Sequence, residues 1–352
     1  MRCIKYLLIL SIFISACKKD DNNNQQIIYS EDFGSGMYIL TEQGISFYNY
    51  LTTDSLRTVT NNIYQSVNNR NINQPKRLHI ASDKAFIIGD QVYIANINTF
   101  ANEGIIDIFS DPVDCKLIDS DRLYVVDRGD ATLKIINIDT KEQSGHIETG
   151  NNSSPMSIEG SWYRVFIMNG GNDNFVDSSI ISIDYFESGV VVNEFSGKLD
   201  VGYNPNSAAF STDHLWVLCK GIYNEQSLVS NTESYIYKIA PWSNIINDNK
   251  KLSNIYNAEN LTINDSRSRL FFSSTDGIYI TDLTIYPILH IPQINSSFIR
   301  LNTEKINDST SVEYLYTNDQ NQIGKVLKYE AWTGDFVESI DLNSEVLDVS
   351  FY

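Results

Sequence analysis

Residues 214–219 read His-Leu-Trp-Val-Leu-Cys, an apolar run with an aromatic residue near its centre. The same column, an apolar residue followed by an aromatic and then mostly apolar residues, occurs seven times along the chain. The seven copies are Met37-Tyr38-Ile39, Val92-Tyr93-Ile94, Leu123-Tyr124-Val125, Val165-Phe166-Ile167, Leu215-Trp216-Val217, Leu270-Phe271-Phe272 and Leu315-Tyr316-Thr317. The first and last aromatic residues are 278 positions apart over six intervals, or about 46 residues each, close to the length of a four-stranded propeller blade.

Each column is followed by a polar turn and a second apolar run, the pattern of consecutive strands. The first unit has no strand before Met37, whereas the chain ends in a strand-like run at 346–352. Pairing that run with the first unit would remove an open sheet edge. The sequence therefore predicts an all-β, seven-bladed β-propeller whose first blade is closed by the C-terminal strand. A pair of β-sandwiches is the alternative, but it gives no reason for a sevenfold aromatic column.

The composition supports strands and excludes several classes of protein. The 352 residues are 42% hydrophobic and 12% aromatic, too apolar for an intrinsically disordered chain. β-branched and aromatic residues favour strands over helices. The net charge of −18 would repel a polyanion, so we expect no nucleic-acid partner.

The N-terminus has the features of an export signal. Arg2 and Lys5 precede an apolar run over 6–14, which is too short to span a membrane. The run ends in Ile14-Ser15-Ala16-Cys17, which resembles a bacterial lipobox, with an ordinary signal peptide as the alternative. Lys18, Lys19, Asp20 and Asp21 follow and resemble the surface-export signal of Bacteroidetes lipoproteins; the alternative is a solvated charge run. We therefore expect a signal peptide over 1–16, a lipidated Cys17 with a polar tether over 17–35, and the propeller over 36–352.

Processing changes the charge and the cysteine count. Without Arg2 and Lys5 the mature chain has 24 basic and 44 acidic residues, a balance of −20, which disfavours anionic ligands. Cys3 leaves with the signal and Cys17 carries lipid. Cys115 and Cys219 remain on different units, too few for a disulfide framework, and are predicted to be buried free thiols.

The residues predict neither a catalytic site nor a cofactor. The four histidines, His79, His146, His214 and His290, lie in different units without metal-ligand spacing. Phosphate loops and nucleophile elbows do not occur in the sequence. Asp173 and Asp177 share a loop, but their spacing is not that of a calcium loop, and a solvated acidic loop is the better interpretation. We expect no enzyme activity and no metal.

The loops on one face are the more informative feature. In a propeller, the loops from the second to the third strand of a blade, and from the fourth strand to the next blade, share a face. Long loops of this kind are predicted at 96–104, 169–178 and 220–233, with a longer connection at 61–83. Insertions on one face are typical of the binding face of a repeat protein. The candidate ligand-binding residues on these loops are Tyr64, Phe100, Arg128, Asn172, Phe175, Lys220 and Tyr223. Aromatic planes with amide and guanidinium donors suit a large, polar-edged small molecule; alternatively, each aromatic packs its own loop down.

The tandem units resemble bacterial surface propellers related to the YVTN repeat family. The resemblance is carried by residues such as Asn204-Pro205-Asn206-Ser207 before the 214–219 column, and by 127–132 leading into 133–140. It covers the chain from about residue 36 and is specific for the fold but weak for the ligand.

The resemblance is greatest to Bacteroidetes outer-membrane lipoproteins, some of which capture cobalamin above a TonB-dependent transporter. It implies a non-enzymatic, lipid-anchored protein on the outer membrane, facing the cell exterior. The implied partners are a nutrient such as a corrinoid and a TonB-dependent transporter. The alternatives are a surface-layer-type interaction or adhesion propeller, and a calcium-dependent hydrolase with carboxylates from several blades in its central tunnel.

Overall fold

The computed structural model describes residues 33–52, 57–151, 153–160, 163–171, 176–187, 190–223, 231–307 and 309–352. The signal segment, Cys17, Lys18, Lys19, Asp20 and Asp21 lie outside these residues. Within the described part, no helix is long and apolar enough to cross a membrane. Residues 31–352 form one compact unit, which is described below.

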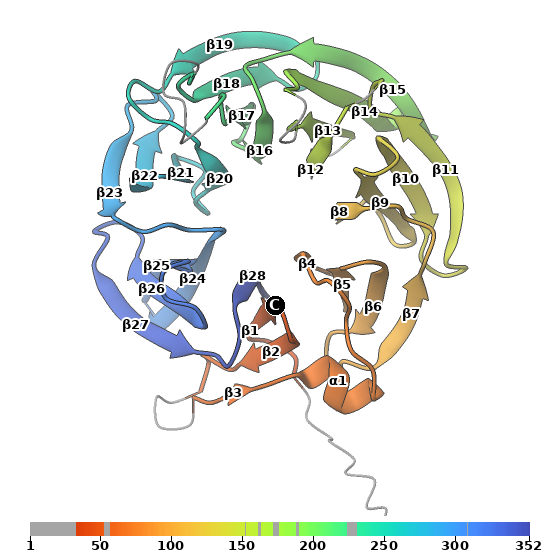
Figure 1. Ribbon diagram of the computed structural model, residues 1–352, viewed down its shortest axis with the longest axis vertical. Helices are drawn as coiled ribbons and strands as arrows, with labels where there is room; N and C mark the ends of the chain where they lie inside the picture. Colours follow the sequence, from red (N-terminus) through yellow and green to blue (C-terminus); the bar gives the residue numbers. More distant parts are fainter. Residues whose placement is uncertain are drawn as a thin grey trace, which may run out of the picture. The chain divides into compact units, whose positions relative to one another are not determined.

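This unit is a seven-bladed β-propeller of seven four-stranded antiparallel sheets (Figure 1). Blades are numbered 1 to 7 in ring order and strands A to D from the centre outward. Blade 1 is β28 (Val346–Phe351), β1 (Met37–Thr41), β2 (Gly44–Tyr48) and β3 (Val59–Thr60); blade 2 is β4 (Arg77–Ala81), β5 (Lys84–Ile88), β6 (Val92–Asn96) and β7 (Asn102–Ile106); blade 3 is β8 (Pro112–Leu117), β9 (Arg122–Asp127), β10 (Thr132–Asn137) and β11 (Glu142–Glu148); blade 4 is β12 (Pro155–Gly160), β13 (Arg164–Asn169), β14 (Ser179–Glu187) and β15 (Val190–Asp200).

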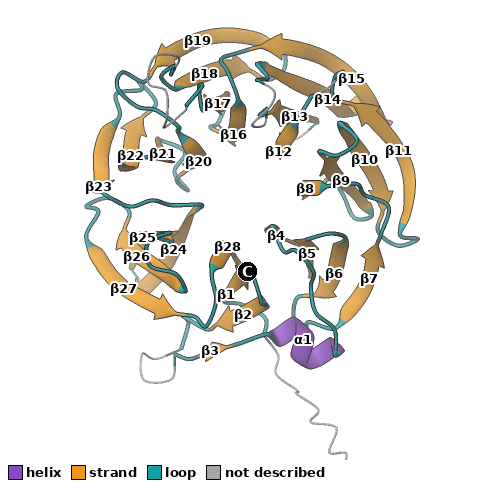
Figure 2. Ribbon diagram, in the orientation of Figure 1, coloured by secondary structure: helices purple, strands orange, loops and turns teal. Residues whose placement is uncertain are grey.

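The remaining three blades follow the same order. Blade 5 is β16 (Pro205–Phe210), β17 (Leu215–Cys219), β18 (Tyr235–Ala240) and β19 (Ile245–Lys251); blade 6 is β20 (Glu259–Ile263), β21 (Arg269–Ser274), β22 (Gly277–Asp282) and β23 (Ile288–Pro292); blade 7 is β24 (Ile299–Asn307), β25 (Thr310–Thr317), β26 (Lys325–Glu330) and β27 (Phe336–Asp341). The helix α1 (Ile63–Asn68) lies between blades 1 and 2 (Figure 2).

The C-terminal strand closes the ring as the sequence predicts. β28 pairs antiparallel with β1, with Met37 opposite Phe351 and Ile39 opposite Val349. Inner strands of neighbouring blades contact one another all the way round, including β28 with β4 and β24 with β28.

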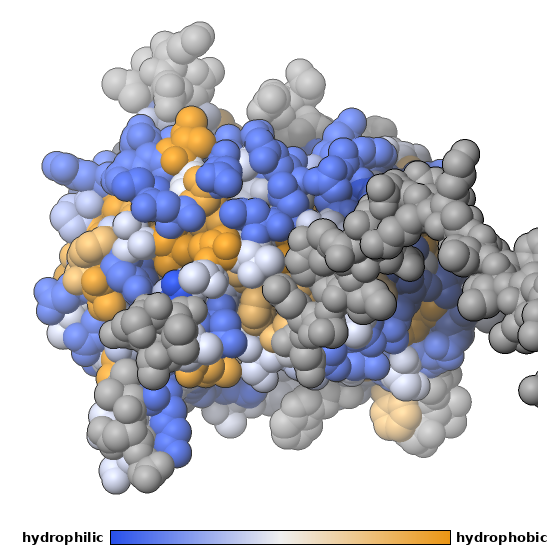
Figure 3. All heavy atoms as spheres, turned by 90° about the horizontal axis from the view of Figure 1, so that it is seen from below, coloured by the Kyte–Doolittle hydropathy of each residue, from blue (hydrophilic) through white to orange (hydrophobic). Residues whose placement is uncertain are grey.

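The core is divided among the contacts between blades. Seven clusters of buried apolar residues in the described chain each join two adjacent blades. Because side chains alternate across a strand, Tyr124 faces blade 4 while Leu123 and Val125 face blade 2. The aromatic column is therefore scaffold, and each of its residues is almost fully buried. Polar residues dominate the side of the ring in Figure 3, with hydrophobic atoms in patches between them.

The loops divide between two faces. Loops joining strands B to C, and strand D to the next blade, lie on one face, here called the B–C face. Turns joining A to B and C to D lie on the opposite A–B face.

The prediction for the second unit is wrong in register. Val92-Tyr93-Ile94 belongs to β6, the third strand, and the second strand is β5 with Phe86 as its buried aromatic residue. The connection at 97–101 is consequently a C–D turn on the A–B face. The predicted long connection at 61–83 contains α1 and the whole of β4. The short run 77–81 was not recognised as a strand in the sequence because β4 carries charged and polar residues.

Candidate functional site

A cavity of about 1650 Å³ occupies the centre of the ring. Its walls come from the inner strands β4, β8, β12, β16 and β20, with Arg300 and Ser350 from blades 7 and 1. Polar and charged side chains on these strands face the cavity, since the innermost edge of each sheet has no further strand to pack against.

The cavity opens on the B–C face over blades 3 to 6. Loop residues at this mouth are Arg128, Gly170, Gly171, Val176, Lys220, Gly221, Ile222, Tyr223 and Asn257. Gly221 has a φ of +83°, and a Cβ there would lie 2.4 Å from the carbonyl oxygen of Thr232. The tight backbone at Gly221 places Lys220 and Tyr223 at the edge of the opening. Tyr223 is half-buried, with its ring 6.3 Å from that of Tyr256.

Three of the predicted ligand-binding residues gather at this mouth. Arg128, Lys220 and Tyr223 come from the B–C loops of blades 3 and 5 and line the same cavity. Asn172, Asp173 and Phe175 lie outside the described residues. Asp177 is buried and accepts hydrogen bonds from the backbone of Ser178 and Ser179, so it organises the start of β14.

Tyr64 and Phe100 do not belong to the site. Phe100 is fully buried in the C–D turn of blade 2, with its ring stacked 5.4 Å from that of Tyr38. Tyr64 is buried in α1, packs against Tyr93, and donates a hydrogen bond to Asn102 Oδ1 at 3.1 Å. Both predictions are wrong because these aromatic side chains gain more by packing their own segments onto the core than by remaining in water.

Ion pairs hold the cationic side chains of the mouth. Asp111 Oδ2 accepts from Arg128 Nε at 2.7 Å, and Asp111 Oδ1 accepts from Lys76 Nζ at 2.6 Å. Burial alone would raise the pKa of Asp111, but these two hydrogen bonds hold it below its ordinary value. Lys220 pairs with Glu259 of β20 across the blade 5–6 contact. Arg128 is thus fixed in place, while its guanidinium keeps donors for a ligand.

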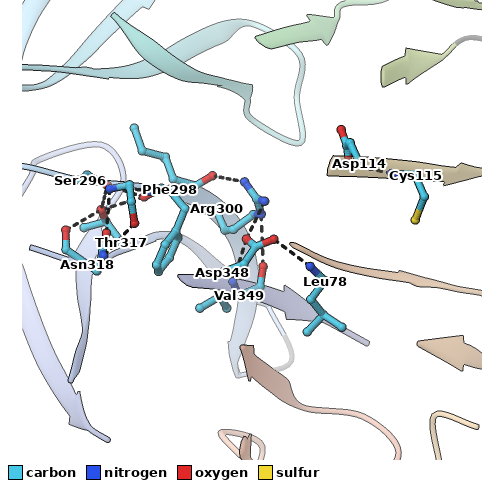
Figure 4. Close-up of polar contacts among 12 residues, drawn as sticks. Leu78, Asp114, Cys115, Ser296, Phe298, Arg300, Thr317, Asn318, Asp348 and Val349 are labelled. Carbon is cyan, nitrogen blue, oxygen red and sulfur yellow. Dashed lines mark hydrogen bonds and ion pairs between the residues drawn. The ribbon is translucent and has the colours of Figure 1, made fainter. Parts of the chain in front are cut away.

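Deeper in the ring, charged residues alternate around blades 7, 1, 2 and 3. Figure 4 shows three of them, Arg300, Asp348 and Asp114. Arg300 Nη2 donates to Asp348 Oδ1 at 2.6 Å, and Asp348 Oδ2 accepts from the backbone N–H of Leu78 at 3.2 Å. Arg77 follows in the next blade and Asp114 in the one after. Burial raises the pKa of Asp114, although the positive charge of Arg77 acts in the opposite direction. Burial would lower the pKa of Arg77, but the carboxylates of Asp114 and Asp348 raise it above its ordinary value.

The corresponding positions in blades 4 and 5 are uncharged serines. Ser207 Oγ accepts from the N–H of Leu261 at 2.9 Å, as Asp114 Oδ2 accepts from the N–H of Ile158 at 3.1 Å. The same position of the inner strand therefore accepts, in several blades, a hydrogen bond from a backbone N–H in the inner strand of the following blade. These contacts satisfy backbone groups at the open edge of each sheet.

A second polar level lies one pleat further along the inner strands. Lys116 Nζ pairs with Glu159 Oε1 at 2.9 Å, and this carboxylate raises the pKa of Lys116 although burial opposes it. Burial, followed by the nearby charge of Lys116, lowers the pKa of His79 to about 4. His79 is therefore neutral at physiological pH and offers an imidazole to the cavity.

The net charge of the chain does not describe this cavity. Six cationic residues line it, namely Arg77, Lys116, Arg128, Lys220, Arg267 and Arg300, against the four carboxylates Asp114, Glu159, Glu259 and Asp265. Arg128 and Arg300 pair in addition with Asp111 and Asp348, so the charges around the cavity are close to balance. The expectation that the acidic balance of the chain disfavours anionic ligands stays a prediction.

Among the described residues, no group of three or more His, Cys, Asp or Glu side chains is placed to hold a metal ion. Asp348 of blade 1 and Asp114 of blade 3 are separated by blade 2, which carries Arg77. The two predicted free thiols, Cys115 and Cys219, are both buried, and burial raises the pKa of each thiol. Reactive thiolates need the opposite shift.

The sequence interpretation missed the inner-strand residues of the site. Arg77, His79, Lys116 and Glu159 lie on strands β4, β8 and β12, which the column pattern did not identify. Their signal was available as charged residues inside short runs about ten positions before an aromatic column, as in 113–117 before Tyr124.

Comparison with known proteins supports the fold alone. No family model matches the chain, and no curated protein matches it by sequence. A quinonprotein alcohol dehydrogenase-like protein from Bacteroides thetaiotaomicron has a similar structure, with a TM-score of 0.65 and 12% identity, covering 92% of this chain and 79% of that one. Kuenenia stuttgartiensis hydrazine synthase (TM-score 0.59, 12% identity, 77% of this chain and 87% of that one) and the Cps50 (Swd1) β-propeller domain of Myceliophteria thermophila (0.56, 12%, 78% and 89%) are also similar.

Proposed function

We propose that this chain is a non-enzymatic binding protein, anchored through Cys17 to the outer membrane and facing the cell exterior. Its ligand is a nutrient of the corrinoid class, such as cobalamin, which it passes to a TonB-dependent transporter. The observation that carries the binding role is the 1650 Å³ cavity, which opens between B–C loops of blades 3 to 5. A cavity of this size exceeds what an ordinary small metabolite fills.

The chemistry of the mouth supports a large ligand with a polar edge. Tyr223 offers an aromatic face, while Arg128 and Lys220 offer donors held in place by carboxylates. Corrinoids carry amide side chains and a phosphate, which accept hydrogen bonds from such donors.

Titration calorimetry of the mature chain with cobalamin tests this proposal. We expect saturable binding, and Tyr223→Ala should weaken it about tenfold, equivalent to about 1.4 kcal/mol. Tyr203→Ala is the matched control, because Tyr203 is an exposed tyrosine on the same face that does not line the cavity. No heat with the unaltered chain, or equal losses in both variants, would contradict the proposed site.

A further inference from the structure

Four consecutive blades expose an aromatic side chain at their C–D turns. Phe186 of blade 4 is 43% exposed, Trp242 of blade 5 is 57%, Tyr286 of blade 6 is 67% and Trp332 of blade 7 is 43%. We call these four residues the aromatic rim. The C–D turns of blades 2 and 3 expose polar residues instead, such as Thr99 and Thr140. The outer strands β15, β19, β23 and β27 follow one another around the ring (Figure 2), so the aromatic rim belongs to four neighbouring blades.

The surroundings of the aromatic rim are apolar and locally cationic. The first residue of the outer strand is also exposed and apolar in three of these blades: Ile245, Ile288 and Phe336. Lys250 Nζ lies 4.2 Å from the centroid of the Tyr286 ring, and Arg269 Cζ lies 4.0 Å from that of Trp332. Each cation comes from the preceding blade, so the aromatic rim combines indole and phenol rings with positive charge.

The chain that leads from Cys17 reaches the propeller on this same face. The N–H of Phe33 donates to the carbonyl oxygen of Asn98 at 2.7 Å, and Asn98 lies in the C–D turn of blade 2. β1 then begins at the A–B face, where Met37 pairs with Phe351 at the end of β28. The B–C loops that line the cavity lie on the opposite face, while Asn264, Asp265 and Arg267 of an A–B turn line the same cavity from this face.

The segment between Cys17 and Phe33 is too long to decide which face of the ring approaches the membrane. Sixteen residues of extended chain reach about 55 Å, enough for either face to approach the surface that holds the anchor. Orientation must come from the propeller surface itself. Trp and Tyr side chains concentrate at membrane–water interfaces, where the ring is sheltered and its polar group stays hydrated, and nearby Lys and Arg can reach lipid phosphates.

We propose that the aromatic rim rests on the lipid surface that carries the Cys17 anchor, so that the B–C loops at the edge of the cavity point away from the membrane. This orientation rests on the proposed anchor and not on the identity of the ligand. It suits capture of a solute from the surrounding medium, while the end of the cavity lined by Asn264, Asp265 and Arg267 faces the membrane that would hold the transporter. Because the chain as a whole is acidic, the contact depends on the aromatic and apolar residues rather than on general attraction to anionic lipid.

Tryptophan quenching by brominated lipid tests this orientation. The chain from Cys17 onward is coupled at that residue to a maleimide lipid, since Cys115 and Cys219 are buried, and is placed on phosphatidylcholine vesicles. A parent with Trp162, Trp242 and Trp332 changed to Phe retains the buried Trp216 as reference. Restoring Trp242 or Trp332 should add fluorescence that brominated phosphatidylcholine quenches.

Tyr203→Trp in the same parent is the matched control. Tyr203 is 49% exposed on the B–C face, so its tryptophan should add fluorescence that the lipid does not quench. Quenching of the Tyr203→Trp variant, or none at Trp242 and Trp332, overturns the proposal; the second result favours a protein partner on the aromatic rim. If the parent does not fold, Trp332→Phe and Tyr203→Trp in the otherwise unaltered chain give the same comparison. The measurement uses no ligand, so its failure leaves the cobalamin titration unaffected.

Discussion

His79 shows how the inner strands create an unusual environment for a single residue. Its ring lies beside the Lys116–Glu159 pair at the wall of the cavity, and its pKa is lowered to about 4. In the unfolded chain a histidine titrates near 6.5. The unfolded state therefore binds a proton between these two pH values while the folded state does not.

This difference predicts a loss of stability in acid. As the pH falls from about 6.5 to about 4, the free energy of unfolding should drop by about 2 kcal/mol through His79. His79→Gln should remove this part of the decline, whereas His146→Gln, an exposed position, should not. Urea unfolding midpoints between pH 4 and pH 7 measure the difference. Parallel curves for the unaltered chain and His79→Gln would show that the imidazole is not held neutral by the fold.

Single residues also explain two errors in the sequence interpretation. Tyr64 and Phe100 looked like ligand-binding aromatics because they lie among polar residues. In the structure they form one buried cluster with Tyr38 and Tyr93. Polar neighbours in sequence do not report burial when the segment folds back onto a core, and no periodic pattern marks such a segment.

At the scale of elements, the second strand of the blade carries the strongest signal. Its aromatic residue is buried, and a basic residue often stands two positions before this aromatic, directly ahead of the column. Arg122 reaches the carbonyl oxygen of Val192 in blade 4 at 2.9 Å, and Arg164 reaches that of Pro241 in blade 5 at 2.7 Å. These residues join one blade to the next, so the repeat in the sequence reflects a repeated contact.

Blade 2 shows the limit of that signal. Its second strand reads Lys84-Ala85-Phe86, where the small Ala85 weakens the apolar pattern. The third strand, with Val92-Tyr93-Ile94, matches the column better and was assigned in its place. Both strands are buried on both sides, and periodicity alone does not distinguish two such runs.

Removal of the closing strand, β28, tests the role of a single element. Chains that end at Ser344 lose β28, which pairs with β1 and contributes the Asp348 carboxylate to Arg300 and Leu78. We expect an open edge at β1, a lower thermal midpoint and association through that edge. A peptide of residues 345–352 should restore the monomer in gel filtration, and a scrambled peptide should not. A truncated chain that stays monomeric with an unchanged midpoint would contradict closure by β28.

At the scale of the whole molecule, the seven repeats and their closure were predictable because burial constrains them in every blade. The mouth was predictable only in part. Arg128, Lys220 and Tyr223 follow second strands that the column located correctly, whereas the inner strands that supply Arg77 and His79 have no shared pattern. Loop and inner-edge residues are less constrained by packing in the core, so the repeat does not fix their identity.

The molecule has two faces with different properties. The B–C face carries the loops at the edge of the central cavity, and the A–B face carries the aromatic rim and the approach of the chain from Cys17. The net charge of −18 belongs to the surface as a whole and describes neither feature.

Hydrogen exchange with and without saturating cobalamin tests the central claim, ligand capture at the mouth, most directly. The account predicts slower exchange in the loops at 128–131, 170–171 and 220–223, with no change in the C–D turns at 241–244 and 331–335. Unchanged exchange at the mouth, or protection confined to those C–D turns, would contradict it.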